Sequence, residues 1–182
     1  MPSPLCVKIE ASDKDSGKSL LEDGWRQIGC LLTYRGVITK TEEVSDVWRG
    51  TGKHDNALAH TLAANIPWSS RLFKDRRDAL GLTKIDSEIT WAYRQKRLYV
   101  SENGFLVVKH EEHGFRIGLI GVLPTHQKSK QATKLIRFAR NDIDKTGPMW
   151  IIAGTYQDNQ GARKLYASLG MEVVKSELIF HK

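Results

Sequence analysis

The stretch from residue 115 to residue 132 constrains the fold more than any other part of the chain. Residues 115–122 (FRIGLIGV) are predicted to be a strand that ends at Leu123-Pro124. The polar residues 126–131 follow, and an amphipathic helix begins after them. A strand that leads through a loop into a helix presents unpaired backbone N–H groups and the positive end of the helix dipole. The sequence therefore predicts an anion-binding site at this loop.

The elements around this stretch predict a mixed sheet. Strands at 97–100, 105–109 and 115–122 are separated by short breaks, one of which contains Asn103-Gly104, and this predicts an antiparallel meander. After the helix, residues 149–153 (MWIIA) form an apolar run typical of a strand buried on both faces. A helix over 159–169 and a strand over 171–181 complete a β-α-β-α-β order. The predicted fold class is α/β (α+β), with a mixed sheet.

Upstream of the meander, the pattern predicts strands at 5–10 and 25–34 and helices at 16–23, 56–64 and 85–94. In the helix that follows the loop, an apolar stripe runs from Ala132 to Ile143. Three basic residues are predicted to lie off this stripe: Lys134, Arg137 and Arg140.

Composition restricts the partners. The chain has 182 residues, 40% of them hydrophobic, and none of its apolar runs approaches the roughly 20 residues of a membrane span. Its first residues lack the apolar region of a signal peptide, so we expect a cytoplasmic protein with no membrane span. The net charge of +7 fits an acidic partner such as a nucleotide or a coenzyme phosphate. Because the charge is dispersed and no nucleic-acid-binding motif is present, nucleic acid is the weaker interpretation.

The cysteine and histidine pattern indicates neither a disulfide framework nor a metal site. The two cysteines, Cys6 and Cys30, are able to pair, but in a reducing cytosol we interpret them as free thiols. The six histidines are scattered without the spacing of metal ligands.

The two ends of the chain resemble each other. Shifted by about 146 positions, Gly24 falls on Gly170, and the residues around each predict a helix, a glycine and a long strand. Leu20 then corresponds to Tyr166. We interpret this as a partial internal duplication, although chance similarity in so short a unit is the alternative.

Two motifs, in order and on the expected elements, resemble the signatures of the Gcn5-related N-acetyltransferase (GNAT) superfamily. The first is Val122-x-Pro124-x-x-Gln127-x-x-Lys130-x-Ala132, and the second is Asn159-x-x-Ala162-x-x-x-Tyr166-x-x-x-Gly170-Met171. The resemblance implies acetyl-CoA as co-substrate. It implies that the following residues bind it: Leu119, Ile120, Gly121, Val122, Gln127, Lys128, Ser129, Lys130, Gln131, Ala132 and Asn159.

One position departs from the family pattern. Lys130 stands where the family has glycine, which allows the backbone to approach a pyrophosphate closely. A lysine can supply charge to a phosphate instead. The alternatives are weakened coenzyme binding or a degenerate member that does not turn over.

The implied reaction is direct attack of an amine on the thioester. The resemblance assigns Tyr166 as the catalytic acid that protonates the CoA thiolate, whereas a buried tyrosine can also serve packing alone. Asn159 either contacts the coenzyme or simply caps its helix. The general base is not visible, because the strand at 115–122 carries no carboxylate and Glu111, Glu112 and His113 are expected to face solvent.

Four segments, namely residues 69–75, the predicted helix at 85–94, the strand residues 116–120 and the end at 176–182, resemble a narrower group. These are bacterial acetyltransferases that act on the amine of dTDP-linked 4-amino-4,6-dideoxy sugars, fucosamine-type. It implies a nucleotide-linked amino sugar as the acceptor, for cell-surface polysaccharide, and a partial GNAT-like segment at 1–66 before an acetyltransferase domain at 67–182. The acceptor residues it nominates are Ser70, Arg71, Lys74 and Trp91. Acetylation of a protein N-terminus or a small amine is the alternative, and a homodimer is possible.

Overall fold

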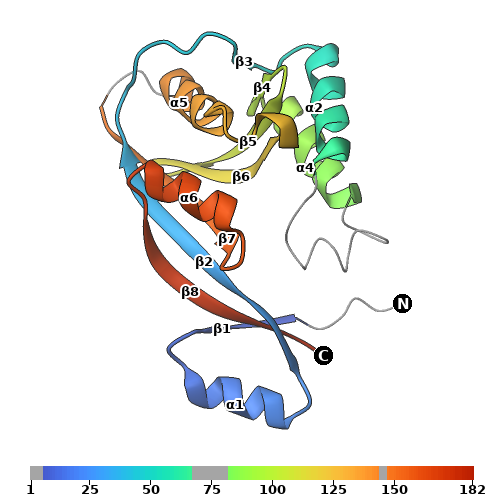
Figure 1. Ribbon diagram of the computed structural model, residues 1–182, viewed down its shortest axis with the longest axis vertical. Helices are drawn as coiled ribbons and strands as arrows, with labels where there is room; N and C mark the ends of the chain where they lie inside the picture. Colours follow the sequence, from blue (N-terminus) through green and yellow to red (C-terminus); the bar gives the residue numbers. More distant parts are fainter. Residues whose placement is uncertain (1–5, 67–81, 144–146) are drawn as a thin grey trace. The chain divides into compact units, whose positions relative to one another are not determined.

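The computed structural model describes residues 6–66, 82–143 and 147–182. In these residues the strands form a mixed sheet in the order β1-β8-β2-β7-β6-β5-β4-β3, shown in Figure 1. The chain divides into two compact units, one made of Met1–Arg35 with Gly154–Lys182 and the other of Gly36–Ala153. Among the described residues, no helix is long and apolar enough to span a bilayer.

The unit Gly36–Ala153 is built on the predicted meander. Strands β3 (Trp48–Arg49), β4 (Leu98–Ser101), β5 (Gly104–Glu111) and β6 (Gly114–Val122) pair antiparallel, each with the next. Helix α5 (Gln131–Ile143) then crosses over to β7 (Met149–Tyr156), which pairs parallel to β6. A helix of this length is the usual connection between parallel neighbours, because their ends lie at opposite edges of the sheet.

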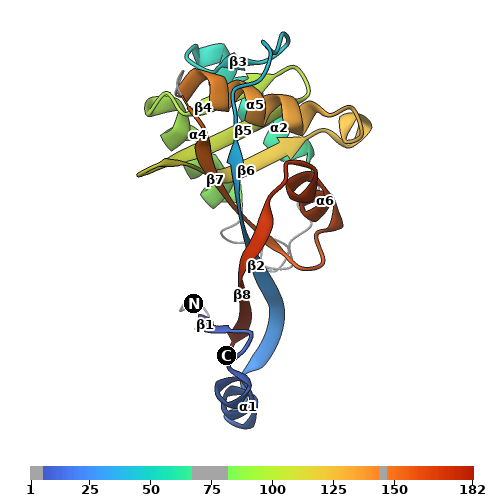
Figure 2. The same ribbon diagram turned by 90° about the vertical axis from the view of Figure 1, so that its left-hand side faces the viewer.

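Helices cover both faces of the meander. Helices α2 (Lys53–Asn65) and α4 (Leu82–Arg94) form an apolar core with alternate residues of β4 and β5, including Leu98, Val100 and Phe105. The intervening Tyr99 contacts Phe138 of α5, with ring centroids 6.1 Å apart. Because successive side chains of a strand point to opposite faces, α5 lies across the sheet from α2 and α4. In Figure 1, α5 is on the left of the strands and α2 and α4 are on the right, and in the turned view of Figure 2 α5 lies toward the viewer.

The other unit is a small antiparallel sheet with two helices. Strand β8 (Glu172–His181) lies between β1 (Cys6–Glu10) and β2 (Arg26–Ile38) and pairs antiparallel with both. Helix α1 (Lys14–Glu22) connects β1 to β2, and helix α6 (Gln160–Ser168) precedes β8. Cys6 and Cys30 are both free thiols, as predicted.

The two ends of the chain have the same local hydrogen bonds at an offset of 146 residues. The N-cap carboxylate of Asp13 accepts from the Ser16 N–H, and the N-cap amide oxygen of Asn159 accepts from the Ala162 N–H. Each helix ends before a glycine with positive φ, 82° at Gly24 and 72° at Gly170. Both glycines occupy the left-handed position that commonly ends a helix.

The pairing of β2 with β8 repeats the same relation. Leu31 is opposite Glu177, and these two residues are themselves 146 positions apart. On either side, Cys30 pairs with Leu178 and Leu32 pairs with Ser176. A shift of 146 positions relates Cys30 to Ser176 and Leu32 to Leu178, so exchanging the two strands turns one pair into the other. The two strands therefore relate by a local pseudo-twofold axis. Descent from a duplication, and the domain bounds 1–66 and 67–182, stay predictions.

Two expectations about burial are wrong. Buried and more accessible residues alternate along β7, and Trp150 is 39% exposed, so the strand is not buried on both faces. Arg140 is fully buried instead of lying on the polar side of α5; its guanidinium donates to the carbonyls of Ile38 and Gly147. Arg140 follows Ile136 by one turn, so it borders the apolar stripe, and two carbonyl acceptors compensate its desolvation.

Candidate functional site

The loop between β6 and α5 leaves a group of backbone donors free. A 3₁₀ turn at Pro124–His126 and a further turn carry the chain to α5, with the Ser129 N–H donating to the His126 carbonyl at 3.1 Å. Several later amides have no acceptor among the described residues, namely the N–H groups of Lys128, Lys130, Gln131, Ala132 and Thr133. A helix start with unpaired amides is suited to an anion such as phosphate.

Lys130 has the backbone conformation that glycine favours. Its φ is 61°, in the left-handed region, and its carbonyl accepts from the Lys134 N–H at 3.0 Å. The loop thus keeps a glycine-like geometry at the position where the family has glycine, and the exposed lysine side chain adds positive charge beside the free amides.

Gln131, the first residue of α5, adds a buried donor. Its side chain is only 6% exposed, and its Nε2 has no hydrogen-bond partner among the described residues. An unpaired buried amide is unfavourable until an acceptor reaches it. The free backbone amides, the lysines and this amide together fit the pyrophosphate of a coenzyme.

The edge of β6 next to this loop is open. Pairing between β6 and β7 ends at Ile117 and Ala153, whereas pairing with β5 continues to Val122. Residues 118–122 therefore have no strand partner on the β7 side among the described residues. Leu119 and Ile120 are partly exposed, whereas Gly121 and Val122 are buried. An open strand edge can pair with an extended amide-containing ligand, such as the pantetheine arm of coenzyme A.

Tyr166 lies in the other compact unit, on α6. It is 3% exposed, and its ring packs against that of Tyr34 on β2, with centroids 5.2 Å apart. Burial, and to a smaller extent Tyr34, raise the pKa of the Tyr166 phenol well above its usual value near 10. The phenol therefore stays protonated at neutral and moderately alkaline pH, and it holds its proton more tightly than an exposed tyrosine does.

Asn159 caps α6, as one of the two predicted alternatives requires. Its Oδ1 accepts from the Ala162 N–H at 3.2 Å. Its Nδ2 has no partner among the described residues, so the amide can still donate to a ligand. Tyr166 and Asn159 belong to one compact unit and the loop to the other. Their action on a single coenzyme molecule stays a prediction.

Of the acceptor candidates, Trp91 lies on α4 and is 39% exposed. Ser70, Arg71 and Lys74 lie outside the described residues. Glu111 pairs with Arg116 at 2.7 Å, and the side chains of Glu112 and His113 are 88% and 76% exposed, in agreement with their expected solvent-facing position.

The pattern reasoning missed two groups of residues. Tyr34 meets Tyr166 although more than a hundred positions separate them, and no local motif indicates that contact. On α4, Glu88 binds Lys109 of β5 at 2.8 Å, beside Trp91. The only local signal for this group is the i, i+3 spacing of Glu88 and Trp91, which places both residues on one face of α4, where both contact Lys109.

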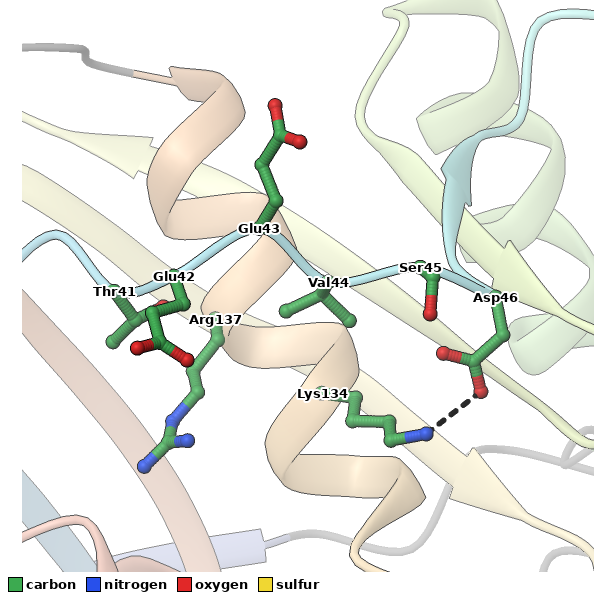
Figure 3. Close-up of a pocket in the computed structure, with 8 residues that line it drawn as sticks. All are labelled: Thr41, Glu42, Glu43, Val44, Ser45, Asp46, Lys134 and Arg137. Carbon is green, nitrogen blue, oxygen red and sulfur yellow. Dashed lines mark hydrogen bonds and ion pairs between the residues drawn. The ribbon is translucent and has the colours of Figure 1, made fainter.

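A shallow pocket of about 370 Å³ lies between the polar face of α5 and residues 41–46, and Figure 3 shows the residues that line it. Lys134 projects from the helix toward Asp46, and its Nζ binds Asp46 Oδ2 at 2.9 Å, whereas the Arg137 side chain points away from residues 41–46. Two more carboxylates, Glu42 and Glu43, line the same pocket. Because acidic residues outnumber basic ones there, this pocket does not favour an anion. In the described part of the chain, no cluster of three potential metal ligands is present.

No protein-family model matches the sequence, and no curated protein matches it. Solved structures do. The GCN5-related N-acetyltransferase from Sphaerobacter thermophilus superposes with a TM-score of 0.69 at 14% identity, over 99% of this chain and 60% of that one. The GNAT-family acetyltransferase from Colwellia psychrerythraea gives 0.64 at 14% identity, over 98% and 64%.

A third neighbour is the GCN5-related glucosamine N-acetyltransferase region of a fungal multi-domain GH3 beta-N-acetylglucosaminidase, with a TM-score of 0.66 at 10% identity, over 95% of this chain and 23% of that one. The chain spans about 60–64% of the length of the first two structures. At these identities the likeness establishes the fold. The predicted fold class is confirmed, and the chain has the fold of GNAT acetyltransferases.

Proposed function

We propose that this protein is an acetyl-CoA-dependent N-acetyltransferase. The observation that carries the proposal is the set of free amides at 128 and 130–133, directly after the open edge of β6. The free amides are suited to a pyrophosphate, and the strand edge is suited to an amide-containing arm that extends from it. Coenzyme A joins these two chemical features in one molecule.

The acceptor that we propose is the amine of a nucleotide-linked amino-deoxy sugar. The narrower sequence resemblance supports it, and so does the name of one structural neighbour, a GCN5-related glucosamine N-acetyltransferase region. Acetylation of a protein N-terminus or a small amine is the second candidate, and no feature of the described residues favours it.

The chain's own groups have distinct tasks in this proposal. The loop amides, the lysines and the Gln131 amide bind the coenzyme phosphates, and the edge of β6 orients the arm that carries the acetyl group. Tyr166 donates a proton to the departing thiolate. Its raised pKa keeps the phenol protonated in the pH range where an amine acceptor is neutral. No carboxylate lies on β6, and in this proposal a water molecule accepts the proton of the amine.

The test is calorimetric titration with acetyl-CoA, followed by mass spectrometry of the full chain with acetyl-CoA and a panel of acceptors. The panel contains a dTDP-linked 4-amino sugar, glucosamine, a peptide with a free N-terminus and a small polyamine. We expect binding of acetyl-CoA and transfer of one acetyl group to the nucleotide-linked sugar. Absence of acetyl-CoA binding would leave a degenerate fold without turnover, and transfer only to the peptide would establish the second candidate.

A further inference from the structure

The outer face of α4 carries a pocket that the coenzyme site does not use. Its volume is about 540 Å³, and residues from three successive turns of the helix line it: Asp86, Ser87, Thr90, Trp91, Arg94 and Gln95. Like the pocket on α5, it is a shallow, open depression, so a ligand there would stay partly exposed to solvent. We call this site the α4 pocket.

The charges of the α4 pocket are separated along the helix. At one end, Asp86 Oδ1 is 2.7 Å from His60 Nδ1, and His60 Nε2 is 3.3 Å from the Thr90 hydroxyl. The carboxylate is therefore engaged by a neighbour from α2. At the other end, two turns away, the exposed Arg94 guanidinium has no hydrogen-bond or ion-pair partner among the described residues. A free guanidinium next to the Gln95 amide is a ready phosphate ligand.

Trp91 supplies an aromatic surface between these ends. Its side chain is 39% exposed, which is unfavourable for a large apolar ring in water. Lys109 Nζ lies 5.7 Å from the ring centroid, and Glu88 holds the same ammonium at 2.8 Å. The Lys109 ammonium therefore contacts the indole from the β5 side in a cation–π interaction, and Trp91 also lines the pocket.

These features match one chemical class. A nucleobase stacks on an exposed indole, a phosphate binds a free guanidinium, and a side-chain amide can hydrogen-bond a base edge or a phosphate oxygen. We propose that the α4 pocket binds a nucleoside diphosphate, the carrier half of the acceptor. This inference rests on the proposed function and deepens it, because it assigns the part of the acceptor that makes the substrate nucleotide-linked.

The test is calorimetric titration of the full chain with thymidine diphosphate in the presence of excess coenzyme A, which blocks the coenzyme site. We expect saturable binding to the wild type. Trp91→Leu and Arg94→Gln should each weaken it by about tenfold, the usual effect of losing one stacking or phosphate contact. Two variants serve as controls and should bind as the wild type does: Trp150→Leu, which removes an equally exposed tryptophan, and Arg26→Gln on β2.

The outcomes separate this inference from the proposed function. If the wild type binds acetyl-CoA but not thymidine diphosphate, or if Trp91→Leu and Arg94→Gln bind it as tightly as the controls do, the α4 pocket is not a nucleotide site, while the acetyltransferase proposal stands. If a single-stranded oligonucleotide binds more tightly than the diphosphate through the same residues, the inference is likewise overturned. Loss of acetyl-CoA binding in the wild type would refute the proposed function itself.

Discussion

At the scale of single residues, Lys130 combines an unusual backbone conformation with a proposed role in coenzyme binding. Its φ of 61° is a conformation that costs a non-glycine residue about 1 kcal/mol or more. This conformation occurs in the loop whose backbone amides at 128 and 130–133 have no acceptor among the described residues. This left-handed geometry is compatible with a binding loop, and two other non-glycine residues, Asp46 and Lys96, also adopt it.

Lys130→Gly should raise the free energy of unfolding by about 0.5–1 kcal/mol relative to Lys130→Ala, because only glycine relieves the strain at positive φ. Both variants lose the side-chain charge. Urea unfolding measures the stability and calorimetry the affinity for acetyl-CoA. An equal loss of affinity for acetyl-CoA in both variants would show that Lys130 contributes to binding through its charge. If Lys130→Ala were more stable than Lys130→Gly, the backbone at this position would not be strained.

In the proposed function, Tyr166 is the second residue on which turnover depends. Tyr166→Phe should lower turnover by about 100-fold and leave the affinity for acetyl-CoA unchanged, because it removes only the donated proton. The matched control is Tyr99→Phe, another buried tyrosine, which lies in the other compact unit. Steady-state kinetics and calorimetry on both variants test this. Wild-type turnover in Tyr166→Phe would leave the tyrosine with a packing role only.

At the scale of elements, helix α6 depends on its N-cap residue, Asn159. Asn159→Ala should lower the free energy of unfolding by about 1 kcal/mol, because it removes the acceptor for the Ala162 N–H. Asn159→Ser keeps that acceptor and removes the unpaired Nδ2. We therefore expect Asn159→Ser to fold with nearly wild-type stability and to bind acetyl-CoA more weakly. Unchanged affinity would leave Asn159 as a cap alone.

The contact between β6 and β7 depends on the absence of a side chain at Gly114. A Cβ there would come within 1.8 Å of the Trp150 carbonyl oxygen, which the backbone can relieve only by moving apart. Gly114→Ala should lower the free energy of unfolding by about 3 kcal/mol or more. Gly118→Ala, in the same strand, should change it by less than about 1 kcal/mol, because its nearest contact is a side-chain methyl of Val107 at 3.3 Å. Similar effects of the two substitutions in thermal and urea unfolding would be the contrary result.

At the scale of the whole molecule, two buried phenols couple stability to alkaline pH. Burial is the main cause that raises the pKa of both Tyr99 and Tyr166 above 10. The unfolded chain loses these protons near pH 10, whereas the folded chain keeps them, so their stabilising effect is complete below pH 10 and is lost as the pH rises above it.

The free energy of unfolding should therefore fall above pH 10, by at most about 1.4 kcal/mol per pH unit for each tyrosine. Urea unfolding of the wild type at several pH values between 9 and 11.5 measures this slope. Tyr99→Phe and Tyr166→Phe should each make it shallower, and the double variant should have the smallest slope. An identical slope in the wild type and the double variant would show that these phenols do not couple to unfolding.

Local structure was largely predictable from the sequence. Helix caps and hairpin turns use hydrogen bonds between residues a few positions apart, as at Gly24, Asn159 and Gly170. Element bounds were less accurate where a longer-range contact intervened. Helix α2 begins at Lys53 instead of residue 56 because the Asp55 carboxylate accepts from the Gly52 N–H and also binds the Trp48 indole.

What the sequence determined by itself is the order of the helices and of all strands except the two-residue β3, the loop after β6 and the candidate residues on it. The tertiary structure decided which distant residues meet: Tyr34 with Tyr166, Arg140 with the carbonyl of Ile38, and Lys109 with Trp91. The physical reason is the range of the interactions. Periodicity and capping act within a few residues, whereas burial and side-chain pairing depend on strands and helices that chain folding brings together.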